Sequence, residues 1–73
     1  MTTFGDYLSR KSIKKAEVSR KTGISTARLS ELSHNESTNL KVNELYLISL
    51  AIGVKPSEIL NYVCSHLKLK TTK

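Results

Sequence analysis

The sequence predicts an all-α fold of five short helices around one hydrophobic core. Apolar residues recur mostly at helical spacing, and strand-like alternation occurs only at Leu67-Lys68-Leu69-Lys70. Gly23, Gly53 and Pro56 stand where helices would end or begin. The chain has 73 residues, enough for one domain, and a chain of this size buries only about 60% of its unfolded surface.

The first two helices have recognisable ends. Thr3 with Asp6 three residues later resembles a capping box, which predicts a helix that runs to about Lys11. A second helix is expected from 15 to 22, because Gly23 can take a positive φ at no steric cost and so end it.

A third helix follows a short turn. Ser25 is placed to cap a helix from 26 to 33. The polar stretch 34–39 predicts a loop, in which Asn35 can supply a left-handed turn residue.

The last two helices complete the core. The fourth ends at Gly53, and its core face is expected to hold Val42, Leu45, Ile48, Ser49 and Ile52. Pro56 suits the first turn of the fifth, whose inward residues are expected to be Ile59, Leu60 and Val63. We assign residues 1–65 to this domain and 66–73 to a basic C-terminal tail. Residues 65–73 are compatible with a helix extension, an added strand or a loose tail.

Positive charge gathers in one half of the chain. Twelve lysines and arginines against six acidic residues give a net charge of +6. Residues 10–28 hold seven cations and one anion, Glu17, whereas residues 29–62 balance to −2. Charge density alone fits either a surface for a polyanion or a solvated face that aids solubility.

Residues 16–32 combine a short helix, a glycine turn and a capped helix, which together predict a helix-turn-helix. On a helical wheel Leu29 and Leu32 face the core. The residues expected to read DNA bases lie on the opposite side: Thr26, Ala27, Ser30 and Glu31. Because the basic cluster coincides with this helix pair, we expect cations here to hold the phosphates of duplex DNA.

Two blocks of sequence resemble phage-repressor and Cro-like helix-turn-helix domains, the XRE family. The resemblance covers roughly residues 13–60 and rests on Val18-Ser19, Gly23-Ile24-Ser25, Leu29-Ser30, Leu32, Ala51-Ile52-Gly53-Val54 and Pro56-Ser57-Glu58-Ile59-Leu60. It implies a compact lambda-repressor-like DNA-binding domain with the helix-turn-helix at helices two and three.

The resemblance also implies roles for single residues. Lys15 stands at a phosphate-contacting position, and Thr26, Ala27 and Glu31 stand at base-reading positions. Ala27 could contact only a thymine methyl group, and Glu31 could accept from a cytosine amino group. With the basic cluster added, the expected phosphate-binding residues are Lys11, Lys14, Lys15, Arg28, His34, Asn35 and Ser37.

The fourth helix carries apolar residues on a second face, at Tyr46, Leu47 and Leu50. One interpretation is a helix buried on both faces by helices one and five. The other is a contact surface, continued on helix five by Tyr62 and Leu67. The candidate interface residues are therefore Tyr46, Leu47, Leu50 and Tyr62.

The sequence lacks the residues that a disulfide scaffold, a zinc site or a glycine-rich phosphate loop would need. One cysteine, Cys64, excludes an internal disulfide scaffold and favours a reducing compartment. Cys64, His66 and His34 are too few for a zinc site, and the three glycines are isolated. We expect no metal, no cofactor and no enzymatic activity. No apolar run approaches the roughly 20 residues of a membrane span, and no signal peptide is expected, so the predicted location is the cytoplasm.

The sequence therefore predicts a sequence-specific regulator of transcription that binds double-stranded DNA, most simply a repressor. We expect a homodimer on a palindromic operator, with half-sites about 34 Å apart. The alternative is an antitoxin, which would bind a toxin protein through the surplus apolar surface and also repress its own operon.

Overall fold

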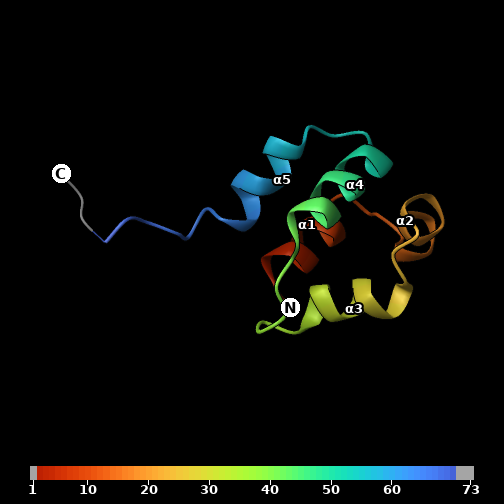
Figure 1. The fold of residues 1–73 in the computed structure, drawn as a ribbon, viewed down its shortest axis with the longest axis horizontal. Helices are drawn as coiled ribbons and strands as arrows, with labels where there is room; N and C mark the ends of the chain where they lie inside the picture. The colour runs from red at the N-terminus through yellow and green to blue at the C-terminus, as the bar shows by residue number, and fades with distance from the viewer. Residues whose placement is uncertain (1, 71–73) are drawn as a thin grey trace.

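The computed structural model describes residues 2–70, which form five helices and no strand. The helices are α1 (Thr3–Arg10), α2 (Lys15–Thr22), α3 (Thr26–His34), α4 (Val42–Ile52) and α5 (Pro56–Val63). The predicted all-α class and the order of five helices are confirmed. Figure 1 shows α3 along one edge of the body, α5 at the far side from it, and the segment after α5 running away from the body.

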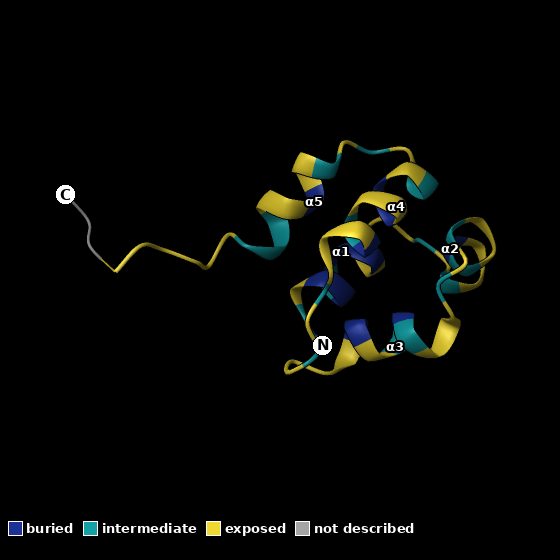
Figure 2. Ribbon diagram, viewed as in Figure 1, coloured by how far each residue is buried: buried dark blue, intermediate teal, exposed yellow. Residues whose placement is uncertain are grey.

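Each helix contributes to one core. α1 packs against α3 and α5, α2 against α3 and α4, and α4 against α5. The buried apolar side chains are Phe4, Tyr7, Leu8, Val18, Leu29, Leu32, Ile48 and Ile59. In Figure 2 the buried segments face the interior, and much of the outer surface of α3 is exposed. Because α1 and α2 hold α3 from the core side, its opposite side stays free.

Three of the expected helix ends are confirmed. Gly23 and Gly53 follow α2 and α4 with φ of 82° and 76°, in the left-handed region that favours glycine. The Ser25 hydroxyl accepts a hydrogen bond from the Arg28 backbone N–H at 3.1 Å and so caps α3.

The cap of α1 is Thr2, so the prediction of Thr3 was wrong by one residue. The Thr2 hydroxyl accepts from the Gly5 N–H at 3.0 Å and donates to the Leu32 carbonyl of α3 at 2.7 Å. The Thr2 hydroxyl, one residue before the predicted cap, therefore both caps α1 and joins α1 to the end of α3. Asp6, one turn further along, pairs with Arg10 at 2.8 Å.

Asn35 does not take the expected left-handed conformation, because it is extended, with φ of −103°. Its side-chain oxygen accepts from the Ser37 N–H at 3.0 Å and from the Ser37 hydroxyl at 2.8 Å. This local turn makes a positive φ unnecessary. Among residues 2–70, the non-glycine residue in the left-handed region is Ser12, with φ of 55°, in the turn between α1 and α2.

Two expected core residues are exposed. Val42 is 85% exposed and Leu60 is 50% exposed. Val42 shares a helix face with the buried Ser49, seven residues later, but as the first residue of α4 it stands beyond the end of the core. Leu60 follows the fully buried Ile59, and successive helical residues point about 100° apart.

The outer face of α4 is not covered by the described chain. α4 packs against α2 and α5, so the interpretation that α1 and α5 bury it on both faces was wrong. Tyr46, Leu47 and Leu50 are 54%, 40% and 59% exposed.

Aromatic and polar contacts join α1 to α5. The rings of Tyr7 and Tyr62 meet edge to face with centroids 5.2 Å apart. The Tyr7 hydroxyl donates to Glu58 at 2.6 Å, and the Tyr62 hydroxyl donates to Asp6. Burial and the Glu58 carboxylate raise the pKa of Tyr7, so its hydroxyl stays protonated as a donor.

Truncation of the core in α4 tests this packing. Ile48→Ala should destabilise the protein by about 2–5 kcal/mol, because Ile48 is 0% exposed and its loss leaves a cavity. Val42→Ala in the same helix is the control and should change the free energy of unfolding by less than about 0.5 kcal/mol. Urea unfolding followed by circular dichroism measures both. Equal losses in the two variants would contradict the described burial of α4.

Candidate nucleic-acid interface

The side of α3 that faces away from the core is open. Thr26, Ala27 and Glu31 are exposed, and Ser30 is half-buried. Leu29 and Leu32 anchor the opposite side at 0% and 3% exposure. Within residues 2–70, no other segment covers this edge, so an elongated ligand can approach it along the helix.

Two lysines stand beside the start of α2. Lys14 is exposed, and Lys15 is half-buried as the first residue of the helix. Lys15 and His34 line one shallow pocket of about 240 Å³, together with α1 residues. Within residues 2–70, neither lysine forms an ion pair. Lys15 thus brings unpaired positive charge to the place where the start of α2 meets the end of α3, whereas Lys14 lines a separate hollow toward the end of α4.

Lys11 is engaged inside the chain. Its Nζ lies 3.0 Å from the Glu58 carboxylate and 5.5 Å from the centroid of the Tyr7 ring. The structure therefore attaches Lys11 to the joint between α1 and α5, whereas neither Lys14 nor Lys15 pairs with a carboxylate of residues 2–70.

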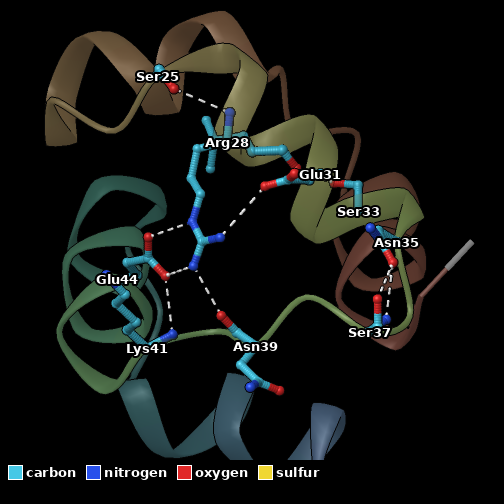
Figure 3. A network of polar contacts seen from close by, with 10 residues as sticks. Ser25, Arg28, Glu31, Ser33, Asn35, Ser37, Asn39, Lys41 and Glu44 are labelled. Atoms are coloured by element: carbon cyan, nitrogen blue, oxygen red, sulfur yellow. Dashed lines mark hydrogen bonds and ion pairs between the residues drawn. The ribbon is translucent and has the colours of Figure 1, made fainter.

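Arg28 is also turned toward the protein, as Figure 3 shows. Its Nε and one terminal nitrogen donate to the two oxygens of Glu44, at 2.8 and 3.0 Å. That terminal nitrogen also donates to the Asn39 carbonyl, at 2.9 Å. The other terminal nitrogen lies 3.6 Å from Glu31. The guanidinium thus connects α3 to the first turn of α4 and to the loop between them.

Glu44 is a site residue that sequence reasoning missed. Besides Arg28, it accepts from the Lys41 N–H at 3.0 Å, which satisfies a free donor at the start of α4. The Arg28 guanidinium lowers the pKa of Glu44 against the opposing effect of burial. The available signal was an acidic residue at the third position of a predicted helix, the position that reaches back to the cap.

The loop after α3 presents polar side chains. His34, Asn35 and Ser37 are all exposed at the end of the helix. The Ser37 N–H and hydroxyl are both directed to the Asn35 side chain, so the turn is internally bonded.

The candidate interface residues divide into two groups. Tyr46, Leu47 and Leu50 are exposed together on α4. Tyr62 is half-buried, with its ring against Tyr7 and its hydroxyl on Asp6. The structure therefore separates Tyr62, as part of the α1–α5 joint, from the exposed stripe of α4.

Among residues 2–70, no group of three or more His, Cys, Asp or Glu side chains is arranged to hold a metal ion. None of the described helices combines the length and the hydrophobicity needed to cross a membrane.

A comparison with protein families identifies what the chain resembles. A family model described as Cro/C1-type HTH DNA-binding domain matches residues 6–65, a span that contains most of α1 and all of α2–α5. No curated protein and no solved structure matches the chain. The resemblance to the Cro-like family that the sequence predicts is confirmed.

Replacement of Glu44 tests the link between α3 and α4. Glu44→Gln should lower the free energy of unfolding by about 1–3 kcal/mol at pH 7, because the Arg28 guanidinium loses its charged acceptor. The folded-state pKa of Glu44 lies below its ordinary value of 4.5. The contribution of Glu44 to the free energy of unfolding is therefore complete above pH 4.5 and is lost as the pH falls through the lowered pKa. Thermal unfolding between pH 3 and pH 7 measures this, and the two proteins should converge at low pH.

Glu31→Gln is the matched control. Glu31 is 3.6 Å from Arg28 and its side chain is 56% exposed, so its removal should cost well under 1 kcal/mol. A Glu44→Gln variant as stable as this control at pH 7 would show that the Arg28–Glu44 contact does not hold α3.

Proposed function

Because the chain belongs to the Cro/C1-type HTH DNA-binding domain family, we propose that it regulates transcription by inserting α3 into the major groove of duplex DNA. The observation that carries this proposal is the open edge of α3, which bears short side chains. Lys15, at the start of α2, lines one pocket with His34 at the end of that helix. The proposed role is binding, with no catalytic step and no cofactor, and the proposed location is the cytoplasm.

We propose that the exposed edge of α3 reads the bases. Thr26 and Ser30 carry hydroxyls that can donate to or accept from base edges, and Ala27 fits against a thymine methyl group. Glu31 can accept from the amino group of cytosine. The exposure of this edge supports the assignment, because no movement of the described chain is needed to bring it to DNA.

The proposed phosphate contacts centre on Lys14 and Lys15. Both are free of ion pairs within residues 2–70, and a DNA phosphate would supply the missing partner. His34, Asn35 and Ser37 extend the same surface beyond α3. Lys11 and Arg28 would reach a phosphate only by sharing their bonds to Glu58 and Glu44, so we assign Arg28 chiefly to positioning α3.

We further propose that the regulator acts as a homodimer on a palindromic operator. Two-fold symmetry would set the half-sites about 34 Å apart, one turn of the duplex. A protein seated in the major groove excludes other proteins from the same DNA, so repression is the simplest outcome.

Removal of the two free lysines tests the phosphate contacts. Lys14→Ala/Lys15→Ala should weaken binding to all duplexes and reduce the slope of log K against log salt by about 2, roughly 1 per lost phosphate contact. Fluorescence anisotropy titrations between 50 and 200 mM salt, on a duplex selected from a random pool, measure both effects.

Thr26→Ala is the matched control for base reading. It should relax the preference at one base pair and leave the salt slope unchanged, because no phosphate contact is lost. An unaltered salt slope in the double lysine variant would contradict the assignment of Lys14 and Lys15.

The exposed stripe of α4 supports a second candidate, an antitoxin that binds a toxin protein and also represses its own operon. Tyr46, Leu47 and Leu50 are apolar, adjacent and uncovered in the described chain, and Tyr62 lies on the neighbouring helix. Such a patch commonly marks a protein contact. The two candidates differ in one observation: an antitoxin copurifies in fixed stoichiometry with the product of an adjacent gene, whereas a dedicated repressor is isolated with itself alone.

A further inference from the structure

A second apolar surface lies away from α3. A groove of about 340 Å³ runs between the start of α1, the α3–α4 loop and the end of α5. Apolar side chains line its interior, among them Phe4, Leu32, Leu45 and Val63, and two exposed residues, Val42 and Leu60, also border it. Cavities of about 150 Å³ accept a benzene molecule, so this groove has room for two leucine-sized side chains.

The segment after α5 carries two exposed leucines. Leu67 and Leu69 are 63% and 82% exposed and alternate with Lys68 and Lys70. The segment is not helical, and in an extended chain alternate side chains point to the same side. Figure 1 shows it leaving the body, which makes the structure 44 Å long against 24 and 22 Å in the other directions.

We propose that this groove receives the Leu67-Lys68-Leu69-Lys70 segment of a second copy of the chain, and that the two copies exchange these segments about a two-fold axis. The inference rests on the homodimer of the proposed function and identifies where that dimer forms. Both leucines would enter the groove from one side of the segment, and both lysines would remain in solvent.

Charge supports a second copy as the occupant. Part of the groove wall comes from residues 29–62, whose charge balances to −2, and Glu36 is among the lining residues. Lys68 and Lys70 of the incoming segment would lie near this carboxylate. None of residues 10–28 lines the groove, so this contact would not require the basic cluster of either copy to enter it.

The geometry of the chain disfavours its own segment as the occupant. Leu67 already forms one border of its own groove. Leu69 lies about 6.6 Å further along an extended chain that departs from the body, and it is 82% exposed. Exchange between copies would fill two grooves at once, and a domain of this size gains much from the added burial.

Sedimentation equilibrium without DNA tests the exchange. The unaltered chain should dimerise, and Leu67→Ser/Leu69→Ser should raise the dimer dissociation constant at least tenfold, because each leucine loses its apolar burial. Leu47→Ser/Leu50→Ser on the α4 stripe is the matched control and should change the constant by less than about twofold. A dimer that survives the tail substitutions, or that is lost with the α4 substitutions, would overturn the proposal.

Isotope-filtered nuclear Overhauser spectra of a mixed labelled sample identify the occupant directly. Contacts between the Leu69 methyls of one copy and the Val63 or Leu45 methyls of the other are expected. A monomer, or contacts found only within one copy, would overturn the proposal. The Lys14→Ala/Lys15→Ala variant should dimerise normally, so a failure of DNA binding and a failure of segment exchange are distinguished.

Discussion

The architecture depends on how α3 is fixed from one side only. Leu29 and Leu32 hold its inner face, while hydrogen bonds fix the helix at two points along its length. Near its start, Arg28 joins it to Glu44 and to the Asn39 carbonyl, and near its end the Leu32 carbonyl accepts from the Thr2 hydroxyl. A helix held in this way can keep its outer edge bare without becoming mobile. The base-reading role proposed for that edge rests on this rigidity, because base edges must be met at fixed distances and angles.

Formal charge overstates what the basic half of the chain presents to a ligand. Of the seven cations in residues 10–28, four lie in ion pairs within the described chain: Arg10, Lys11, Arg20 and Arg28. Pairs such as Arg10–Asp6 are exposed and weak, so they can open for a stronger partner. The Arg28–Glu44 pair is less exposed and has two parallel hydrogen bonds, so it is the least available. The count of charged residues identifies the basic half of the chain. The ion pairs within residues 2–70 then show which of its cations have no acidic partner there.

Local signals predicted most of the fold, and long-range contacts account for most of the errors. Gly23, Gly53 and Ser25 mark helix ends through their own backbone chemistry, which one sequence suffices to reveal. The Thr2 cap was missed because its hydroxyl also serves a carbonyl 30 residues away. In the candidate site, the open edge of α3 follows from helical periodicity. The Arg28–Glu44 pair joins residues 16 positions apart, and no periodicity connects them.

The distribution of the aromatic residues gives the molecule an internal optical reporter. The chain has three tyrosines and no tryptophan, so tyrosine dominates its near-ultraviolet absorption. Tyr7 and Tyr62 are in edge-to-face contact at the joint between α1 and α5, whereas Tyr46 stands on the exposed stripe of α4. Near-ultraviolet circular dichroism therefore senses two events through different chromophores: loosening of the α1–α5 joint through the coupled ring pair, and coverage of α4 through the single exposed ring.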